Sequence, residues 1–349
     1  MADWRKTLVG AEATIRDVIG IIDTNDYQIA LIVDAENRLV GSVTDGDIRR
    51  ALLRGASLND PLTQVMNGKP ISVPASTGSD EIAEIMARKV IRQMPLLDDD
   101  ARVCGLVHVD FLSGRTARRD NLVVFMAGGL GSRLRPLTED IPKPMIKVGD
   151  KPLLEAIFDN FIRAGFYRFA VSVNYKGNII KDHFGDGSSR GVEITYIEES
   201  EPLGTAGSLR LLKEEPTLPV IVMNGDVLTS INIGHLLDFH AEMGAVGTMA
   251  VREYDFQVPY GVVQTENSLI TAIDEKPVHV FFVNAGIYVL DPAAFGMIPA
   301  SGRFDMTSLF AELRAKNMTS VAFPIREYWL DIGRHDDLDQ ARREIREIK

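Results

Sequence analysis

The chain has 349 residues, of which 45% are hydrophobic and 25% are charged, and its formal net charge is −11. A chain of this length can form two domains, each with its own core. The acidic balance argues against a long basic face for nucleic acid or an anionic membrane. The single cysteine, Cys104, excludes an intramolecular disulfide and a cysteine-rich zinc site. No apolar run has the length of a signal peptide or a membrane helix, so we expect a cytoplasmic protein.

An internal repeat with an offset of 64 residues occupies the first third of the chain. Residues 27–48 (YQIALIVDAENRLVGSVTDGDI) align with residues 91–112 (IRQMPLLDDDARVCGLVHVDFL). Both copies have the pattern of a strand, an acidic turn, a second strand and a helix. Units this short do not bury both of their faces alone, so we expect the two copies to pack together as a pair.

The repeat resembles a tandem pair of cystathionine-β-synthase (CBS) domains, modules that often bind adenine nucleotides and regulate an attached enzyme. The resemblance covers about the first 115 residues and implies an α+β module over residues 1–118, with domains at about 8–58 and 62–118. The role it implies is regulation or dimerisation, and the ligand it implies is an adenine nucleotide.

In CBS domains a Gly-h-h-Thr-x-x-Asp stretch holds the phosphate and the ribose of the nucleotide, and GSVTDGD supplies Thr44 and Asp47. We expect a helix that begins at Ile48, whose free backbone N–H groups would face the phosphate. In the alternative interpretation, Asp47 only caps this helix. The second copy departs from the motif, because His108 replaces the threonine and Asp110 comes one residue early.

Residues 121–349 follow a polar, basic join and have a different pattern, in which strand-like and helix-like runs alternate. This pattern predicts an α/β fold with a mainly parallel, doubly wound sheet. The strand-like runs are LVVFMA, RFAVSV, VEITYI and PVIVMN, and the helix-like runs are PLLEAIFDNFIRAG, NIIKDHF and TAGSLRLLKE. Further on, TMAVRE, YGVVQT, ITAID and FFVNAGIYVLD lie closer together and predict an antiparallel addition that covers a substrate.

A glycine-rich turn follows the first of these strands, in the string LVVFMAGGLGSRLRPLTEDIPKPMIKV. The string is not a dinucleotide-binding fingerprint, because Leu134 stands where G-x-G-x-x-G requires its third glycine. It is not a P-loop, because no G-K-[ST] follows Gly131 and the lysine comes only at Lys143. A turn that needed glycines only for its backbone would not explain Arg133 and Lys143.

The string resembles the signature of the sugar-1-phosphate nucleotidyltransferases, G-G-x-G-[ST]-R-L-x-P followed by P-K-P, from Gly128 to Pro144. These enzymes transfer a nucleoside monophosphate from a nucleoside triphosphate to a sugar 1-phosphate and release pyrophosphate. The resemblance extends over residues 121–349 and implies a Rossmann-like, GT-A-like mixed sheet. It implies that Arg133 braces the leaving β- and γ-phosphates, and that Lys143 binds the α-phosphate and the sugar phosphate.

The same resemblance assigns the nucleotide to the glycine turn and to the string EESEPLGTAGSL, in which Glu199 would accept hydrogen bonds from guanine. An exposed acidic turn is the alternative interpretation of Glu199 and its acidic neighbours. The residues implied to bind the nucleotide are Ala127, Gly128, Gly129, Gly131, Ser132, Glu199, Gly204, Thr205 and Ala206.

Metal and sugar phosphate are assigned to later motifs in the same way. Asp226 in VIVMNGD and Asp331 in YWLDIG would bind Mg²⁺, although each alone is more typical of a turn or a helix cap. Strand ends and a hairpin turn are the alternative for the glycines of the sugar motifs. The residues implied to bind the sugar phosphate are Gly261, Glu275, Lys276, Asn284 and Gly286.

The order of the two domains resembles a group of enzymes linked to surface sugars such as legionaminic acid and other nonulosonic acids. It implies GTP and glucosamine 1-phosphate as substrates. We also expect a homo-oligomer, either a dimer or a larger assembly. A uridylyltransferase for an N-acetylhexosamine 1-phosphate is the alternative, and an inactive nucleotide-sensing subunit is an alternative of another class. The presence of Arg133, Lys143, Asp226 and Asp331 together argues against an inactive subunit.

Overall fold

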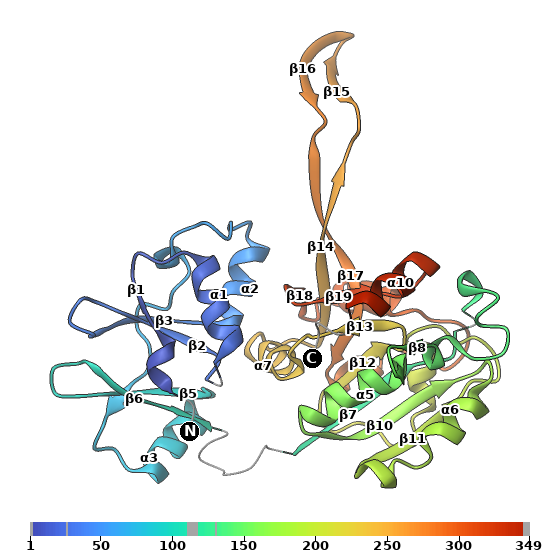
Figure 1. Cartoon of the computed structure of the whole chain (residues 1–349), viewed down its shortest axis with the longest axis horizontal. Coiled ribbons are helices and arrows are strands. Elements are labelled where there is room, and N and C mark those ends of the chain that lie inside the picture. The colour runs from blue at the N-terminus through green and yellow to red at the C-terminus, as the bar shows by residue number, and fades with distance from the viewer. Residues whose placement is uncertain (1–2, 26, 110–117, 130, 345–349) are drawn as a thin grey trace. The chain divides into compact units, whose positions relative to one another are not determined.

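The computed structural model of the protein describes residues 3–25, 27–109, 118–129 and 131–344. The chain divides into two compact units, Met1–Arg118 and Arg119–Lys349 (Figure 1). Within the described ranges, no helix has the length and apolarity that a membrane span requires.

The first unit contains two three-stranded sheets with the same topology, β1-β2-β3 and β4-β5-β6. In each sheet the first strand is parallel to the second, and the second is antiparallel to the third. The strands are β1 (Leu8–Gly10), β2 (Ile29–Val33), β3 (Leu39–Thr44), β4 (Val73–Pro74), β5 (Gln93–Leu97) and β6 (Val103–His108). The helices are α1 (Ile15–Thr24), α2 (Asp45–Leu53) and α3 (Ser79–Lys89), with the 3₁₀ turns η1 (Trp4–Thr7) and η2 (Leu62–Gln64).

The internal repeat is visible in the register of the strands. The irregularity between Ile32 and Val33 recurs between Leu96 and Leu97, which is the same offset of 64 residues. An isolated bridge joins Arg38 to Arg102, again 64 residues apart. One apolar cluster combines residues of β2 with Val103 and Leu106 of β6. The two copies therefore pack together as a pair, as the repeat predicts.

Helix α2 begins three residues earlier than expected, at Asp45. Thr44 is its N-cap and Asp47 its third residue, and the two form a reciprocal capping box, in which the Thr44 backbone N–H donates to Asp47 at 2.9 Å. The alternative interpretation, in which Asp47 itself is the N-cap, is therefore wrong in its residue, because Thr44 is the cap. Asp110, the aspartate that comes one residue early in the second copy, lies outside the described residues.

The second unit is built around a mixed sheet of seven strands in the order β11-β10-β7-β12-β17-β14-β18. The neighbours from β11 to β12 are parallel, whereas β17 is antiparallel to both of its neighbours. These strands are β7 (Arg119–Met126), β10 (Phe166–Val173), β11 (Glu193–Glu198), β12 (Val220–Asn224), β14 (Gly247–Gln257), β17 (Val278–Leu290) and β18 (Ser320–Ile325). The shorter strands are β8 (Lys147–Val148), β9 (Lys151–Pro152), β13 (Val227–Thr229), β15 (Gly261–Glu266), β16 (Leu269–Glu275) and β19 (Trp329–Asp331).

Helices cover both faces of this sheet, because alternate residues of its strands belong to two separate cores. Phe125 of β7 lies in the larger core with aromatic side chains of α5, and Val124 lies in the smaller core with α9. The helices are α5 (Leu153–Arg163), α6 (Gly177–Phe184), α7 (Ile233–Glu242), α8 (Pro292–Phe295), α9 (Met306–Ala315) and α10 (His335–Glu344). The 3₁₀ turns are η3 (Ser132–Leu134), η4 (Lys143–Met145), η5 (Ser188–Arg190) and η6 (Gly207–Leu211). The predicted α/β class with a mixed sheet is confirmed.

One helix expected in the second unit is replaced by a short turn. The run TAGSLRLLKE forms only the short turn η6, because the backbone N–H groups of Ala206 and Gly207 both donate to the carbonyl of Phe304. The strands β14 to β17 are antiparallel as predicted, and that they cover a substrate stays a prediction; β14 and β17 themselves belong to the central sheet. Their outer parts form a two-stranded ribbon that extends away from it (Figure 1).

The capping box of α2 makes a prediction about stability. We expect Thr44→Ala to lower the free energy of unfolding of the first unit by about 1 kcal/mol, because a buried helix start loses its cap. Thr14 and Asp17 form the same box at α1, so Thr14→Ala should also lower the midpoint of thermal unfolding. Calorimetry of the two variants checks this, and an unchanged midpoint in both would contradict it.

Candidate functional site

The candidate site lies at the carboxyl ends of the parallel strands of the second unit. Ala127 follows β7, Glu199 follows β11, and Asp226 comes two residues after β12. The backbone N–H of Gly225 donates to the carbonyl of Met126 at 2.9 Å, which holds the ends of β7 and β12 together. This edge is where open α/β sheets bind their ligands.

The glycines of the loop after β7 differ in their surroundings. A Cβ on Gly128 would lie 3.0 Å from Oε1 of Glu199, and one on Gly131 would lie 3.0 Å from Cβ of Lys143. Gly131 also has a φ of +61°, which favours glycine. A Cβ on Gly129 would meet no atom of the described residues within 4 Å, so its backbone is open to a ligand. The loop thus needs two glycines for packing and exposes one.

Lys143 is held at the start of η4, between Pro142 and Pro144. Its side chain is only 9% exposed, and Nζ lies 2.5 Å from Oδ2 of Asp226, whose side chain is 28% exposed. The prolines restrict the backbone on both sides of the lysine. The ion pair therefore joins the glycine loop to the end of β12.

The pairing of β13 with β19 brings Asp331 next to Asp226. Val227 is the register partner of Asp331, and the N–H of Ile332 donates to the carbonyl of Asp226 at 3.0 Å. Surrounding protein desolvates the Asp331 carboxyl at the mouth of the site and raises its pKa; the charge of Asp226 raises it further, while Lys143 and Arg133 oppose the rise. Two carboxylates are thus close enough to repel each other.

Arg133 is exposed on η3, and its Nη1 lies 3.3 Å from the position that a Cβ on Gly333 would take. Gly333 comes two residues after Asp331, so the guanidinium borders the same site. Arg133, Lys143, Asp226 and Asp331, which come from three separate motifs of the sequence, are therefore brought together. Ser132, the preceding residue, is also exposed at this loop.

A divalent cation fits this arrangement. Asp226 and Asp331 offer carboxylate oxygens, which are the ligands that hard cations prefer. The pKa of Asp331 is raised first by desolvation and then by the negative charge of Asp226, and a cation would offset that charge. The described residues contain no group of three or more His, Cys, Asp or Glu side chains arranged to hold a metal. A cation bound here would take its remaining ligands from phosphate oxygens and water.

Glu199 is engaged with the protein itself. Ser172 donates a hydrogen bond to its Oε1 at 2.5 Å, and the N–H of Leu203 donates to its Oε2 at 3.0 Å. The carboxylate therefore orders the loop from 199 to 203 beside Gly128. It is not the free acidic turn of the alternative interpretation.

The small residues after this loop have a packing reason. A Cβ on Gly204 would lie 2.6 Å from the carbonyl oxygen of Phe304, Thr205 Oγ1 accepts from the N–H of Met306 at 2.8 Å, and Ala206 is fully buried. All three contact the segment that leads into α9. Their predicted contact with a nucleobase stays a prediction.

The structure separates the predicted sugar residues into two groups. Asn284 and Gly286 lie where β17 enters the sheet, and a Cβ on Gly286 would come within 2.7 Å of Nδ2 of Asn224. Gly261 and Glu275 are register partners near the middle of the ribbon, at the base of the β15–β16 hairpin and next to Lys276, and all three are exposed. Strands β15 and β16, which begin with Gly261 and end with Glu275, lie on the ribbon that extends away from the seven-stranded sheet (Figure 1).

Asn224 was missed from the sequence. Its amide is in contact distance of Gly286, and its Oδ1 is buried without a hydrogen-bond partner in the described structure. An unpaired buried oxygen two residues before Asp226 is well placed to accept from a ligand. Its signal was present in the string VIVMNGD, where a polar residue ends an otherwise apolar strand.

Comparisons with known proteins give the family. The sequence model of the nucleotidyl transferase family matches residues 122–348, and that of the CBS domain matches residues 7–54 and 62–110. The chain belongs to the nucleotidyl transferase family. The predicted resemblances to nucleotidyltransferases and to CBS domains are confirmed.

Among curated relatives, this chain is 31% identical over 224 residues to the D-glycero-alpha-D-manno-heptose 1-phosphate guanylyltransferase of Aneurinibacillus thermoaerophilus. The match covers 64% of this chain and 97% of that protein. The mannose-1-phosphate guanyltransferase of Debaryomyces hansenii is 33% identical over 224 residues. Here the chain spans only 61% of the relative's length, and the match covers 61% of this chain.

Among solved structures, HddC from Yersinia pseudotuberculosis is 26% identical, with a TM-score of 0.50 over 64% of this chain and 99% of that one. A putative glucose-1-phosphate thymidylyltransferase from Bacillus anthracis is 23% identical, with a TM-score of 0.53 over 65% of this chain and 96% of that one. The second likeness shows the fold alone.

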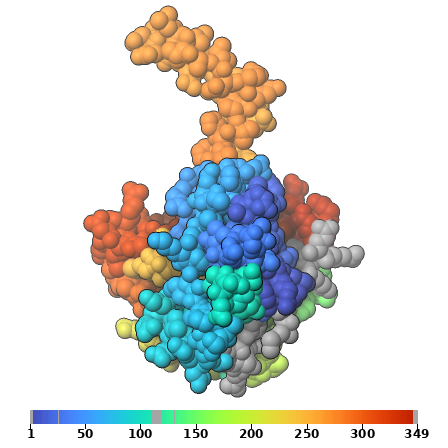
Figure 2. Space-filling model, turned by 90° about the vertical axis from the view of Figure 1, so that its left-hand side faces the viewer, coloured from blue at the N-terminus to red at the C-terminus, as the bar shows by residue number. Residues whose placement is uncertain are grey.

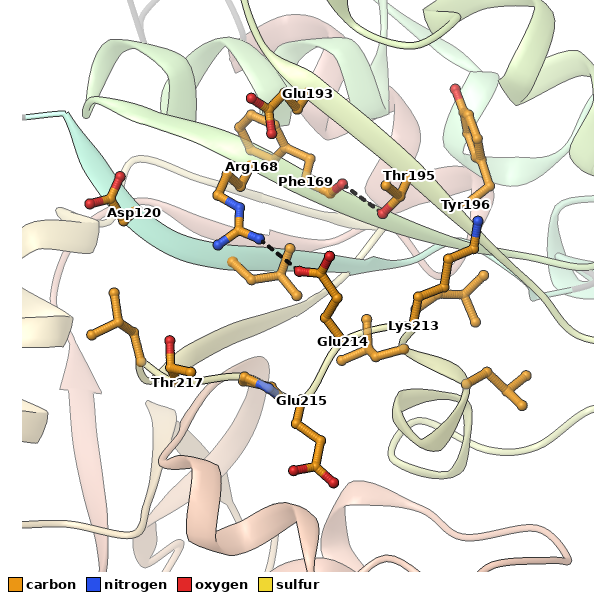
Figure 3. Close-up of a pocket in the computed structure, with 16 residues that line it drawn as sticks. Asp120, Arg168, Phe169, Glu193, Thr195, Tyr196, Lys213, Glu214, Glu215 and Thr217 are labelled. Atoms are coloured by element: carbon orange, nitrogen blue, oxygen red, sulfur yellow. Dashed lines mark hydrogen bonds and ion pairs between the residues drawn. The ribbon is translucent and has the colours of Figure 1, made fainter.

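The second unit also has a cavity of about 310 Å³ at the other ends of the strands (Figure 3). Asp120 and Leu122 of β7, Arg168 of β10 and Glu193 of β11 line it, and the segment from Leu211 to Leu218 closes it. Arg168 pairs with Glu214 across it at 3.5 Å. The cavity is therefore distinct from the carboxyl-end site.

The unequal burial of the Lys143–Asp226 pair makes a prediction that needs no substrate. Asp226→Asn leaves a buried ammonium without its counter-ion, whereas Lys143→Met leaves a carboxylate that water reaches. We expect Asp226→Asn to lower the free energy of unfolding by about 2 kcal/mol and Lys143→Met to cost less. Urea unfolding of both variants measures this, and a larger loss in Lys143→Met would refute the assignment.

Proposed function

We propose that the protein is a cytoplasmic, Mg²⁺-dependent sugar-1-phosphate guanylyltransferase. It would transfer GMP from GTP to a sugar 1-phosphate and release pyrophosphate. The observation that carries this proposal is the meeting of Arg133, Lys143, Asp226 and Asp331 beside the glycine loop. The guanylyltransferase names of the relatives support the choice of reaction.

The residues suggest how the reaction would proceed. An oxygen of the sugar phosphate attacks the α-phosphorus of GTP, and the bond to the bridging oxygen of pyrophosphate breaks. The open backbone at Gly129 and the guanidinium of Arg133 would bind the β- and γ-phosphates. Mg²⁺ held by Asp226 and Asp331 would offset phosphate charge. Lys143 would then exchange its carboxylate partner for the α-phosphate.

GTP is our proposed nucleotide, because several relatives are named guanylyltransferases and HddC was crystallised with GMP-PN. Glu199 would read guanine, since an ionised carboxylate has acceptor sites beyond the two that Ser172 and Leu203 use. Glucosamine 1-phosphate, in surface-glycan precursor synthesis, is our first sugar. Mannose and heptose 1-phosphates, named for the relatives, are the next to test.

The test is to incubate the protein and Mg²⁺ with each nucleoside triphosphate against a panel of hexosamine, mannose and heptose 1-phosphates, and to measure pyrophosphate. We expect release with GTP and one sugar class. Preference for UTP with an N-acetylhexosamine 1-phosphate would favour the alternative uridylyltransferase. No turnover with any pair would instead favour an inactive nucleotide-sensing subunit.

Single variants test the proposed roles. We expect Lys143→Ala and Asp226→Asn to reduce kcat by at least about a hundredfold, because each removes charge at the reacting phosphate. Lys147→Ala is the matched control, since Lys147 is an exposed lysine four residues beyond Lys143. Rates in either site variant equal to those of the control would show that the site is misplaced.

We propose further that the CBS pair regulates the enzyme through Thr44 and Asp47. An adenine nucleotide would have to compete with the capping box, in which the two side chains already bind each other. We expect AMP, ADP or ATP to shift the thermal midpoint or the rate, and Thr44→Ala to abolish that shift. Thr14→Ala is the control, because it removes a helix cap without touching the proposed nucleotide site. If both variants lose the nucleotide-induced shift equally, the CBS pair has only a structural role.

A further inference from the structure

The ribbon that leaves the central sheet is an arm, which we define as residues 253–282. At its base, β17 pairs with β12 as far as Ile287, and β18 pairs with β14 as far as Arg252. Beyond the pair Arg252 with Val283, β14 and β17 have only each other, and β15 and β16 form the tip. Figure 2 shows the arm as a narrow, curved protrusion in orange. A two-stranded ribbon without cover is marginally stable in water.

Both faces of the arm expose large apolar side chains. Tyr254 lies opposite Phe281 on one face, with exposed fractions of 55% and 54%, and Phe256 follows on the same face at 50%. The other face and the tip continue the pattern. The exposed apolar residues of the arm are Tyr254, Phe256, Tyr260, Val263, Leu269, Ile270, Ile273, Val278, Val280, Phe281 and Phe282. A continuous apolar surface of this kind marks an interface.

The area is that of a protein partner. Five half-exposed aromatic side chains offer roughly 500 Å² if each has a surface of about 200 Å². The six aliphatic side chains raise the apolar area to roughly 1,000 Å², compared with about 800 Å² per partner in a standard protein interface. A second copy of the chain brings the same surface, and a symmetric dimer pairs equal patches. A second copy of the chain can therefore cover the apolar surface of the arm without any other protein.

The arm also carries two of the residues predicted to bind the sugar phosphate, and they lie far along it from the central sheet. Glu275 and Lys276 lie at the junction of β16 and β17, and a strand rise of about 3.3 Å per residue puts Lys276 on the order of 20 Å beyond Val283. Folding the arm back would break the unbroken ladder from Arg252–Val283 to Gln257–Val278. Lys276 could pair with a phosphate and Glu275 could accept from sugar hydroxyls.

We propose that two copies exchange arms, so that Glu275 and Lys276 of each copy complete the sugar-phosphate site beside Lys143 of the other. The assignment of a sugar phosphate to this site rests on the proposed function. The exchange itself rests on the direction and the apolar surface of the arm. Burial of the arm aromatic residues against the second copy would stabilise the dimer, and the ribbon would carry the two polar side chains across.

Complementation between two inactive variants tests the exchange. Lys143→Ala removes the site lysine, and Lys276→Ala removes the arm lysine; each alone should lose most of the activity. In a random mixture prepared by co-expression, half of the dimers are mixed, and each mixed dimer has one intact composite site. We expect about a quarter of wild-type activity in the mixture. Activity no higher than that of the single variants would show that the arm acts within its own chain.

A cross-linking experiment makes the test independent of turnover. In a Cys104→Ser background, which removes the exposed native cysteine, Lys276→Cys and Ser132→Cys are made in separate chains. A short bismaleimide should join the two kinds of chain when they are mixed. If only the double variant reacts, within one chain, the exchange is refuted. Cross-linking without turnover in the wild type would sustain the exchange and overturn the proposed function.

The apolar surface is tested by Tyr254→Lys combined with Phe281→Lys. Sedimentation velocity should show the wild type as a dimer and the double variant as a monomer with little activity. Met243→Lys is the control, because Met243 is an exposed apolar residue on the body of the same unit. A double variant that remains dimeric would show that other surfaces hold the two copies together.

Discussion

The ion pair between Lys143 and Asp226 is the contact on which the site depends. It joins two segments 83 residues apart, and its lysine is almost completely buried. A buried ammonium requires a counter-ion, so the glycine loop, η4 and the end of β12 are constrained to one arrangement. With Arg133 and Asp331 added, two positive and two negative side chains balance. A polyanionic nucleotide and a divalent cation therefore suit this site best when they enter together.

Small residues around the site have two separate uses. Gly131, Gly204 and Gly286 all have positive φ angles, and each is packed against another segment where a Cβ would clash. Gly129 instead faces open space. In the sequence these glycines look alike. The structure separates those that hold segments together from the one that leaves backbone N–H groups available to phosphate.

The sequence predicted the features that depend on local pattern. The strands before Ala127 and Asp226 were recognised because they are apolar and continuous, and the carboxyl ends of parallel strands meet at one edge. The start of α2 and the loss of the helix after Thr205 were not predicted. Each depends on a hydrogen-bond partner, Asp47 in one case and the distant Phe304 carbonyl in the other. The direction of the arm was not predicted either, because it depends on where β17 stops pairing with β12 and β14 stops pairing with β18.

Exchange of the arms would change how the two units divide their roles. If the second unit dimerises through its own arm, the CBS pair is not needed for dimerisation and is left with regulation. A ligand that altered the CBS pair could then act on the enzyme by changing how readily two copies meet. Activity would depend on protein concentration, since each sugar site would be assembled from two chains. The exposed aromatic residues of the arm would thereby link the assembly of the enzyme to its substrate specificity.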